Sequence, residues 1–228
     1  MKRPYLSINP KSYLFGQQLL ELARGVDELA GAYGIDTMFT APYVYLAQIV
    51  SETRNLIITA QGMDGIVPGR GMGLVLPDSL ADVGVKGVVL NHAERPMTVH
   101  ELACAVARCR ELGLNSTIAV DSIEEAKMVA VLQPTTIICE QSALIGTGKT
   151  ADTRYMQETT AAIRALSPQT LISQSAGVKS GDDVYRAIAN GADGTGSSSS
   201  VACAEDPLSI VESMFEGADR ARKELCHA

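Results

Sequence analysis

The stretch TTIICEQSALIGTGKT, residues 135–150, places a short apolar run directly before an acid and a glycine-containing loop. Residues Thr135–Cys139 favour a buried strand, so Glu140 would stand at its carboxyl end. In α/β folds, whether barrels or open sheets, the chemistry lies at the carboxyl ends of the strands. Gly146 and Gly148 can adopt the backbone angles that a moving loop needs. Taken alone, the stretch fits an ordinary strand end and turn as well as it fits a base beside a lid.

The rest of the chain repeats the same alternation of short apolar runs and longer amphipathic ones, which is typical of βα units and a parallel sheet. The predicted strands are Tyr5–Asn9, Asp36–Ala41, Leu56–Gln61, Gly87–Asn91, Ser116–Val120, Thr135–Glu140, Leu171–Ser175 and Ala192–Ser197. The predicted helices are Leu19–Tyr33, Thr98–Leu112, Ile123–Leu132, Thr153–Leu166, Asp182–Asn190 and Pro207–Leu225. Eight βα units within 228 residues match a closed (β/α)8 barrel of the α/β class better than an open sheet.

Several predicted helices begin with a capping signal. Thr98 stands three residues before Glu101, and Ser122 stands three residues before Glu125, so each pair can form a capping box. Asp206 precedes a proline, which suits the first position of a helix. These signals place the helix starts independently of the apolar pattern.

No linker or low-complexity segment interrupts the series, so we predict one domain over residues 1–228. The segment Asp64–Ser79 is the exception to the pattern, because it is rich in glycine and poor in helix formers. We expect it to form a long third loop with some interaction role.

Composition excludes several classes of function. The formal charge of −7 and the lack of a Lys/Arg run argue against nucleic-acid binding. The five cysteines are odd in number and lack metal-ligand spacing, and no basic and apolar leader opens the chain. We therefore expect reduced thiols in a cytoplasmic protein, with no metal site and no membrane span.

Polar residues follow the predicted strands where each strand ends. They are Asn9 with Lys11, Gln61, Asn91 with His92, Glu140, and Ser175. A single polar strand end most often only satisfies a loop hydrogen bond, but in a barrel all of these ends meet at one rim. A carboxylate, an imidazole and an ammonium would then lie together. The imidazole of His92 stands near a helix start, which disfavours its cationic form, so we expect a neutral donor.

The last two strand ends suggest a site for a phosphate group. Ser175, Ala176 and Gly177 lead towards one helix, and Ser198 and Ser199 lead towards another. Small residues let backbone N–H groups close around an anion, and a helix start adds a favourable dipole. The loops after strands seven and eight of barrels often bind phosphate. Outside a barrel, the same residues would fit flexible serine-rich turns.

Together these motifs resemble the triosephosphate isomerase family, from Asn9 to about Asp206. Asn9-Pro10-Lys11 resembles the N-x-K element of the family, and residues 91–95, NHAER, resemble its histidine motif. Glu140 and the loop that follows resemble its base and closing loop. The length and the segment at residues 175–178 are similar to the shorter, archaeal-type members, which often form tetramers.

The resemblance implies a TIM barrel that interconverts dihydroxyacetone phosphate and glyceraldehyde 3-phosphate through an enediolate, without a cofactor. Glu140 would move the proton, His92 would polarise the substrate oxygens, Lys11 would offset negative charge, and Asn9 would help to orient the ammonium. This assignment follows the family, which is also a standard example of a carboxylate base paired with a neutral histidine. The resemblance further implies a homodimer or homotetramer.

The resemblance also implies a role for the loop and for the small residues. Closure of residues 141–149 would shield the enediolate from water. The phosphate would be held by the substrate-binding residues, which are Gly146, Ser175, Ala176, Gly177, Gly196, Ser198 and Ser199. Glu94 would position its neighbours rather than react.

Several positions depart from the family pattern. Gln141 stands where members usually carry a proline, Ala93 where they carry a serine, and Met72 where they carry a threonine that crosses a subunit interface. The largest departure is residues 195–200, TGSSSS, where members carry bulky aliphatic residues. We expect Gly196 to leave a space of leucine size beneath the rim.

Two alternative functions therefore stay open. A longer sugar phosphate, such as a tetrulose phosphate, could fill that space and be isomerised by the same proton transfer. A non-catalytic barrel could instead bind a phosphorylated metabolite, although the joint presence of Lys11, His92 and Glu140 argues against it.

Overall fold

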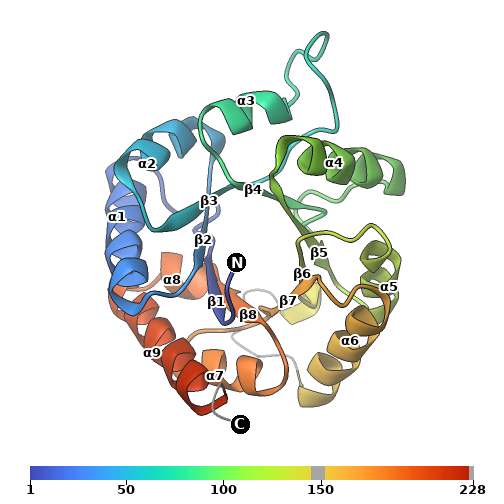
Figure 1. The fold of residues 1–228 in the computed structure, drawn as a ribbon. Helices are drawn as coiled ribbons and strands as arrows, with labels where there is room; N and C mark the ends of the chain where they lie inside the picture. Colours follow the sequence, from blue (N-terminus) through green and yellow to red (C-terminus); the bar gives the residue numbers. More distant parts are fainter. Residues whose placement is uncertain (145–151, 226–228) are drawn as a thin grey trace.

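The computed structural model describes residues 1–144 and 152–225, and its eight strands form a closed parallel barrel (Figure 1). The strands follow one another around the barrel in chain order, and the last strand pairs with the first. They are β1 (Tyr5–Ile8), β2 (Thr37–Ala41), β3 (Leu56–Ala60), β4 (Gly87–Leu90), β5 (Asn115–Val120), β6 (Thr136–Cys139), β7 (Leu171–Gln174) and β8 (Gly194–Ser197). The predicted fold class and all eight strands are confirmed.

Helices surround the barrel on its outside (Figure 1). Those described are α1 (Gly16–Tyr33), α2 (Leu46–Glu52), α3 (Pro77–Asp82), α4 (Val99–Leu112), α5 (Ile123–Ala130), α6 (Thr153–Leu166), α7 (Gly181–Ala189), α8 (Ser199–Ala202) and α9 (Pro207–Leu225), with the 3-10 turns η1 (Tyr43–Tyr45) and η2 (Ser142–Leu144). The six predicted helices are present, whereas α2, α3 and α8 were not predicted. None of the helices in the described ranges is long and apolar enough to cross a membrane.

One of the two predicted capping boxes is complete. The Thr98 side chain accepts a hydrogen bond from the backbone N–H of Glu101, and the Glu101 carboxylate accepts one from the backbone N–H of Thr98. Ser122 likewise accepts from the backbone N–H of Glu125. The Glu125 carboxylate, however, accepts from the backbone N–H of Asp121 at 2.8 Å, so the second box is only half formed.

The last helix, α9, closes the ring by packing beside α1 and α7 (Figure 1). Asp206 caps it, since its carboxylate accepts a hydrogen bond from the backbone N–H of Ser209 at 3.1 Å. Val211, Met214 and Phe215 are fully buried. The predicted N-cap and the predicted packing face are both confirmed.

The interior of the barrel carries many hydroxyl groups. Side chains that alternate along a strand point to opposite faces, and one face of each strand lines the interior. Buried hydroxyl residues stand on most strands, namely Ser7, Thr40, Thr59, Thr117, Thr136 and Ser173. Apolar residues on the opposite faces, such as Leu6 and Phe39, pack under the helices and form the main core.

Two glycines of β8 let β1 lie close beside it. A Cβ atom at Gly194 would come 2.5 Å from Cε1 of Tyr5, and one at Gly196 would come 2.2 Å from the backbone oxygen of Ser7. The backbone of Ser7 therefore already lies where a side chain at position 196 would begin. The expectation that Gly196 leaves an open space of leucine size is wrong, and close packing of the two strands explains this glycine.

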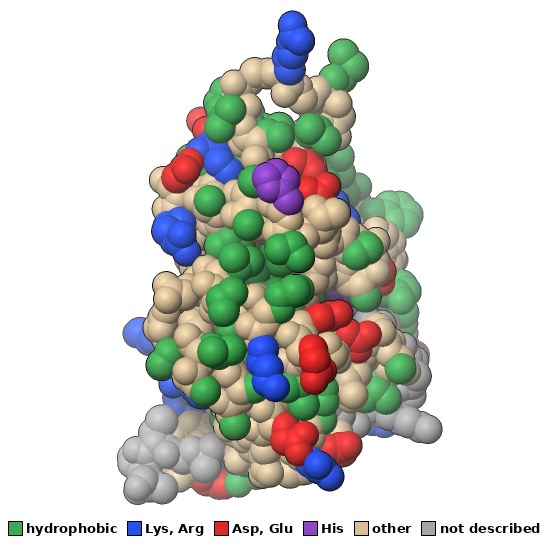
Figure 2. Space-filling view, turned by 90° about the vertical axis from the view of Figure 1, so that its right-hand side faces the viewer, with side chains coloured by type: hydrophobic (Ala, Val, Ile, Leu, Met, Phe, Trp, Pro, Cys, Tyr) green, Lys and Arg blue, Asp and Glu red, His purple; other side chains and the backbone are tan. Residues whose placement is uncertain are grey.

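The third loop projects from the barrel between β3 and α3 (Figure 1). Figure 2 shows it at the top of the molecule, where it carries hydrophobic side chains into solvent. Met72 is fully exposed, and Val67 and Leu74 are at least half exposed. The predicted long loop is present, but it ends earlier than predicted because α3 begins at Pro77.

Candidate active site

The polar residues that follow the strands meet in one cavity of about 50 Å³. Residues from the ends of β1, β4, β6, β7 and β8 line its upper part: Asn9, Lys11, His92, Glu140, Ser175 and Ser198. The carboxylate, imidazole and ammonium expected from the sequence therefore lie together. The barrel brings them together because the carboxyl ends of its parallel strands share one rim.

Glu140 and His92 face each other across this cavity. The Nε2 atom of His92 lies 3.6 Å from a carboxylate oxygen of Glu140. Both side chains are largely buried, with 14% and 18% of their surface exposed. Glu140 is held by its backbone N–H, which donates to the carbonyl of Val120 at 2.9 Å and extends the pairing of β6 with β5. The two atoms are too close for a substrate atom to lie between them, so a small group would contact both side chains from the cavity beside them.

The hydrogen bonds of His92 define its tautomer. Its Nδ1 atom accepts a hydrogen bond from the backbone N–H of Glu94 at 3.1 Å. A ring nitrogen that accepts carries no proton, so the neutral ring carries its proton on Nε2. That N–H points to the side of the ring where Glu140 lies. The arrangement suits a neutral donor, as expected from the sequence.

A tight turn after β4 holds the imidazole in this orientation. Asn91 has a left-handed backbone with φ of 55°. Its amide donates to the carbonyl of Ala119 at 3.1 Å and accepts from the backbone N–H of Met97 at 3.0 Å. The turn is closed by the backbone N–H of Arg95, which donates to the carbonyl of His92 at 2.7 Å. The position of His92 is thus fixed by β4, β5 and the start of α4.

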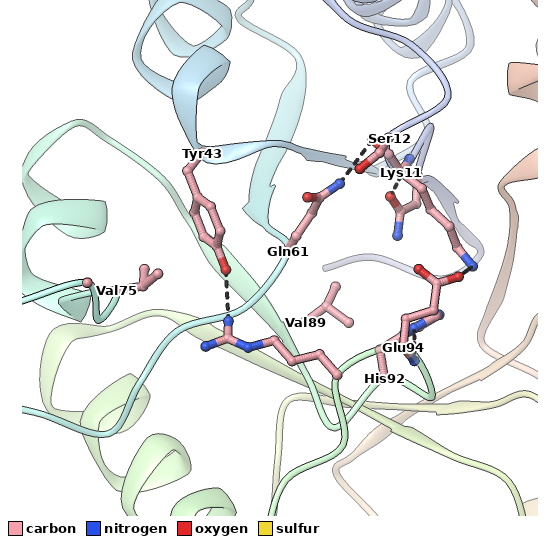
Figure 3. A pocket seen from close by; sticks show the side chains of 11 residues that line it. Lys11, Ser12, Tyr43, Gln61, Val75, Val89, His92 and Glu94 are labelled. Atoms are coloured by element: carbon pink, nitrogen blue, oxygen red, sulfur yellow. Dashed lines mark hydrogen bonds and ion pairs between the residues drawn. The ribbon is translucent and has the colours of Figure 1, made fainter.

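Lys11 reaches the cavity from a constrained backbone. It follows Pro10 and has a left-handed conformation with φ of 48°. Its backbone N–H donates to the Asn9 side chain at 3.0 Å, and its carbonyl accepts from the Gln61 side chain at 3.1 Å. Only 13% of its side chain is exposed. Asn9 and Gln61 therefore hold the backbone of Lys11 at the rim, and Figure 3 shows the contact with Gln61.

The Lys11 ammonium forms an ion pair with Glu94, and the two charged atoms are 2.7 Å apart (Figure 3). The hydrogen bond from Lys11 lowers the pKa of the Glu94 carboxyl, against the opposing effect of burial, and the charge of Lys11 lowers it further. The carboxyl is therefore ionised at neutral pH. Glu94 does not line the cavity that holds Glu140, and its ion pair fixes the end of the Lys11 side chain at the edge of that cavity.

A second cavity of about 400 Å³ adjoins the first on the side of the third loop (Figure 3). Asn9, Lys11, Val89 and His92 line both cavities, and Glu94 lines the second. On its far wall, Arg95 donates to the hydroxyl of Tyr43 at 2.9 Å and to the carboxylate of Asp64 at 3.0 Å. Sequence reasoning missed Tyr43 as a lining residue. Its place just after β2, another strand end, is the signal that could have found it.

The predicted phosphate residues are only partly brought together. Ser175, Gly196 and Ser198 line the cavity. Gly177 and Ser199 are not among the residues that line it, and the side chain of Ala176 is buried in a separate apolar cluster with Met156. Gly146 and most of the predicted closing loop lie outside the described residues.

The segment just after Glu140 is anchored to the end of β5. The backbone N–H and hydroxyl of Ser142 both donate to the carboxylate of Asp121, at 2.9 and 2.5 Å. The hydroxyl of Tyr155, on α6, donates to the backbone carbonyl of Asp121 at 3.0 Å. The chain just after Glu140, which includes Gln141, is therefore held against the end of β5.

Comparison with known proteins places this geometry in a family. The family model described as Triosephosphate isomerase matches residues 4–214. A triosephosphate isomerase of Metallosphaera sedula is 34% identical over 229 residues, covering 98% of this chain and all of that protein. One of Sulfolobus acidocaldarius is 32% identical over 225 residues, covering 97% of each chain, and one of Methanocaldococcus jannaschii is 31% identical over 214 residues, covering 92% and 97%. The chain belongs to the triosephosphate isomerase family.

Proposed function

We propose that this protein interconverts dihydroxyacetone phosphate and glyceraldehyde 3-phosphate through an enediolate. The observation that carries the proposal is the meeting of Glu140, His92 and Lys11 in one largely buried cavity, with His92 and Glu140 3.6 Å apart. The family match and the names of the relatives support it. Both substrates are small phosphorylated sugars, which this cavity and the cavity beside it can admit.

In the proposed reaction, Glu140 takes a proton from the carbon next to the carbonyl and returns it to the neighbouring carbon. A base must lie within reach of the proton that it removes, and a buried carboxylate at the rim meets this need. The Nε2–H of His92 donates to the substrate oxygens while negative charge develops on them. A fixed donor in a site with little water stabilises such charge more than water does.

Lys11 has two roles in the proposal. Its ammonium offsets the negative charge of the enediolate and of the phosphate, and Asn9 holds the Lys11 backbone at the rim. The phosphate binds near Ser175 and Ser198, where the backbone N–H groups at the start of α8 can contribute. Every group that the proposed proton transfer uses belongs to the protein or to the substrate, so the proposed reaction needs no cofactor.

We also infer that the chain forms a homodimer or homotetramer. The support is the exposed apolar surface of the third loop, where Met72 is fully exposed, together with the 400 Å³ cavity beside the site. Apolar side chains that project into solvent are typical of interaction surfaces. Sedimentation of the purified protein would test this inference, and a monomer at micromolar concentration would contradict it.

The state of the cysteines indicates the cellular compartment in which the protein works. The four cysteines within the described ranges, Cys104, Cys109, Cys139 and Cys203, are all unpaired. Unpaired thiols are typical of reducing compartments. We therefore propose that the protein works in the cytoplasm.

A coupled assay of the purified protein on glyceraldehyde 3-phosphate tests the proposed function. Glu140→Gln preserves shape and removes the base, so turnover should fall at least about a hundredfold. Glu124→Gln is the matched control, because Glu124 is an exposed acid on α5 away from the cavity. Equal activity in the wild type and Glu140→Gln, or no activity in the wild type, would contradict the proposal.

A further inference from the structure

The cavity that holds Glu140 and His92 continues below the rim into the barrel. Its lower part is lined by Ser7, Thr40, Val89, Ile138 and Gly196. Ser7 precedes Asn9 by two residues on β1, which corresponds to a depth of roughly 6–7 Å along the strand. Small residues on β8, β1 and β2 make up one side of this lower part, which we call the recess.

The recess and its edge carry hydroxyl groups that lack hydrogen-bond partners. Thr40 is fully buried, Ser197 is 7% exposed, and Ser198 stands at the edge. Within the described part of the chain, no partner is found for Thr40 Oγ1, Ser197 Oγ or Ser198 Oγ. Ser197 is paired with Ile8, so its side chain points to the outer face of β8, and the unpaired hydroxyls that face this cavity are those of Thr40 and Ser198. Buried polar groups are nearly always hydrogen-bonded, so the fully buried hydroxyl of Thr40 calls for a polar occupant. A hydroxyl can donate and accept, and it can rotate to suit such an occupant.

Resting on the proposed proton transfer, we propose that the recess binds a hydroxymethyl group on the reacting carbon of a longer substrate. The substrate class is a four-carbon ketose phosphate, such as erythrulose 1-phosphate, which is dihydroxyacetone phosphate with one hydrogen of its hydroxymethyl carbon replaced by CH2OH. An apolar extension of the substrate would leave the hydroxyl of Thr40 unpaired, whereas a hydroxymethyl group can bond to it. The space does not come from a missing side chain at Gly196, since Ser7 fills that position.

The reaction on this substrate balances without any further reactant. Glu140 breaks the C–H bond at C3, and the electron pair passes to the carbonyl oxygen at C2 to give the enediolate. A proton is then added at C2, and the hydroxyl at C3 loses its proton to become the new carbonyl. The product is erythrulose 4-phosphate, in which C2 of the substrate is reduced and C3 is oxidised. No atom leaves, and the phosphate keeps its bond.

The test is to measure kcat/KM for erythrulose 1-phosphate, as both enantiomers, beside dihydroxyacetone phosphate with the full-length protein. Phosphorus NMR can follow the conversion to the 4-phosphate. Thr40→Val removes the hydroxyl and keeps the shape of the side chain. Thr117→Val is the matched control, because Thr117 is another fully buried barrel threonine whose hydroxyl lacks a described partner, and it does not line this cavity.

We expect a kcat/KM for one enantiomer of at least one tenth of the triose value. Thr40→Val should lower the ratio of four-carbon to triose kcat/KM at least tenfold, and Thr117→Val should leave both values unchanged. Should Thr40→Val fail to fold, Thr40→Ala removes the same hydroxyl with a smaller side chain, and the same ratio should fall.

Other outcomes separate the two proposals. The recess proposal would be overturned if kcat/KM for the four-carbon substrate were below one tenth of the triose value, or if Thr40→Val left the ratio of the two values unchanged. That result would assign the recess to ordered water. If triose turnover still depended on Glu140, the proposed isomerase function would stand. Absence of turnover on either substrate would overturn the proposed function and the recess proposal together. Turnover of the four-carbon substrate alone would support the recess and contradict the triose assignment.

Discussion

His92 presents Nε2 to Glu140 at 3.6 Å while its Nδ1 accepts the backbone N–H of Glu94. One bond therefore fixes both the tautomer and the direction of the proton that the ring can donate. A carboxylate and a fixed neutral donor face the same small volume. This pairing suits the removal of a proton next to a carbonyl, because the base and the donor to the developing oxyanion lie next to each other on the same cavity.

Replacing His92 with Gln tests the role of that donor. The amide can still donate, but it lacks the fixed orientation that the Glu94 backbone gives to the ring. We expect kcat to fall about 10²- to 10³-fold, as when one donor to an oxyanion is lost, with a smaller change in KM. Steady-state kinetics beside circular dichroism would check this, and a change confined to KM would contradict the assigned role.

The ion pair of Lys11 and Glu94 makes stability depend on pH. Because the hydrogen bond from Lys11 lowers the pKa of Glu94 below its ordinary value of 4.5, the pair contributes stability above that value. The contribution is lost as pH falls through the lowered pKa. The difference in unfolding free energy between the wild type and Glu94→Gln should therefore be constant from pH 7 to 5 and shrink below pH 4.5. A difference that grew with acid would contradict the pairing.

Gly196 is predicted to be required by the close approach of β8 to β1. A Cβ atom at this position would come 2.2 Å from the backbone oxygen of Ser7, so the strands would have to separate. We expect Gly196→Ala to lower the free energy of unfolding by roughly 1–3 kcal/mol, as overpacking of a core does. Urea denaturation would measure it. A neutral or stabilising effect would show that there is free space at this position, as the sequence alone suggested.

The cysteines should differ sharply in their reactivity. Burial raises the pKa of Cys109 and the pKa of Cys139 to about 12, so neither forms a thiolate at pH 8. Cys203 is exposed. Brief treatment with a maleimide at pH 8 should label Cys203 and spare the two buried thiols in mass spectra of the digested protein. Labelling of Cys139 in the folded protein would contradict its burial beside Glu140.

The alternation of apolar runs was sufficient to predict the barrel and its eight strands. The strands have four to six residues and are wholly or mostly buried, and each one lies between more polar segments. The helices α2 and α8 were missed because they have seven and four residues, which is too short for a helical period to show. The start of α3 was missed because Pro77 opens a helix inside a glycine-rich segment.

The polar rim could also be predicted, since a barrel brings the ends of its strands together. The network of Tyr43, Arg95 and Asp64 could not, because the partners are 52 and 31 residues apart and nothing local links them. The meaning of Gly196 was misjudged for a related reason. A glycine in a sequence does not show whether open space or a neighbouring backbone lies beside it, and here the neighbour is Ser7.

The central claim is that Glu140 carries the substrate proton, and isotope exchange in D2O tests it most directly. The wild type should convert dihydroxyacetone phosphate into glyceraldehyde 3-phosphate with deuterium at C2, and it should return deuterium to the unreacted substrate. Proton NMR would show both, and Glu140→Gln should slow both by at least about a hundredfold. Exchange in Glu140→Gln at the rate of the wild type, or turnover without any deuterium at C2, would contradict the account.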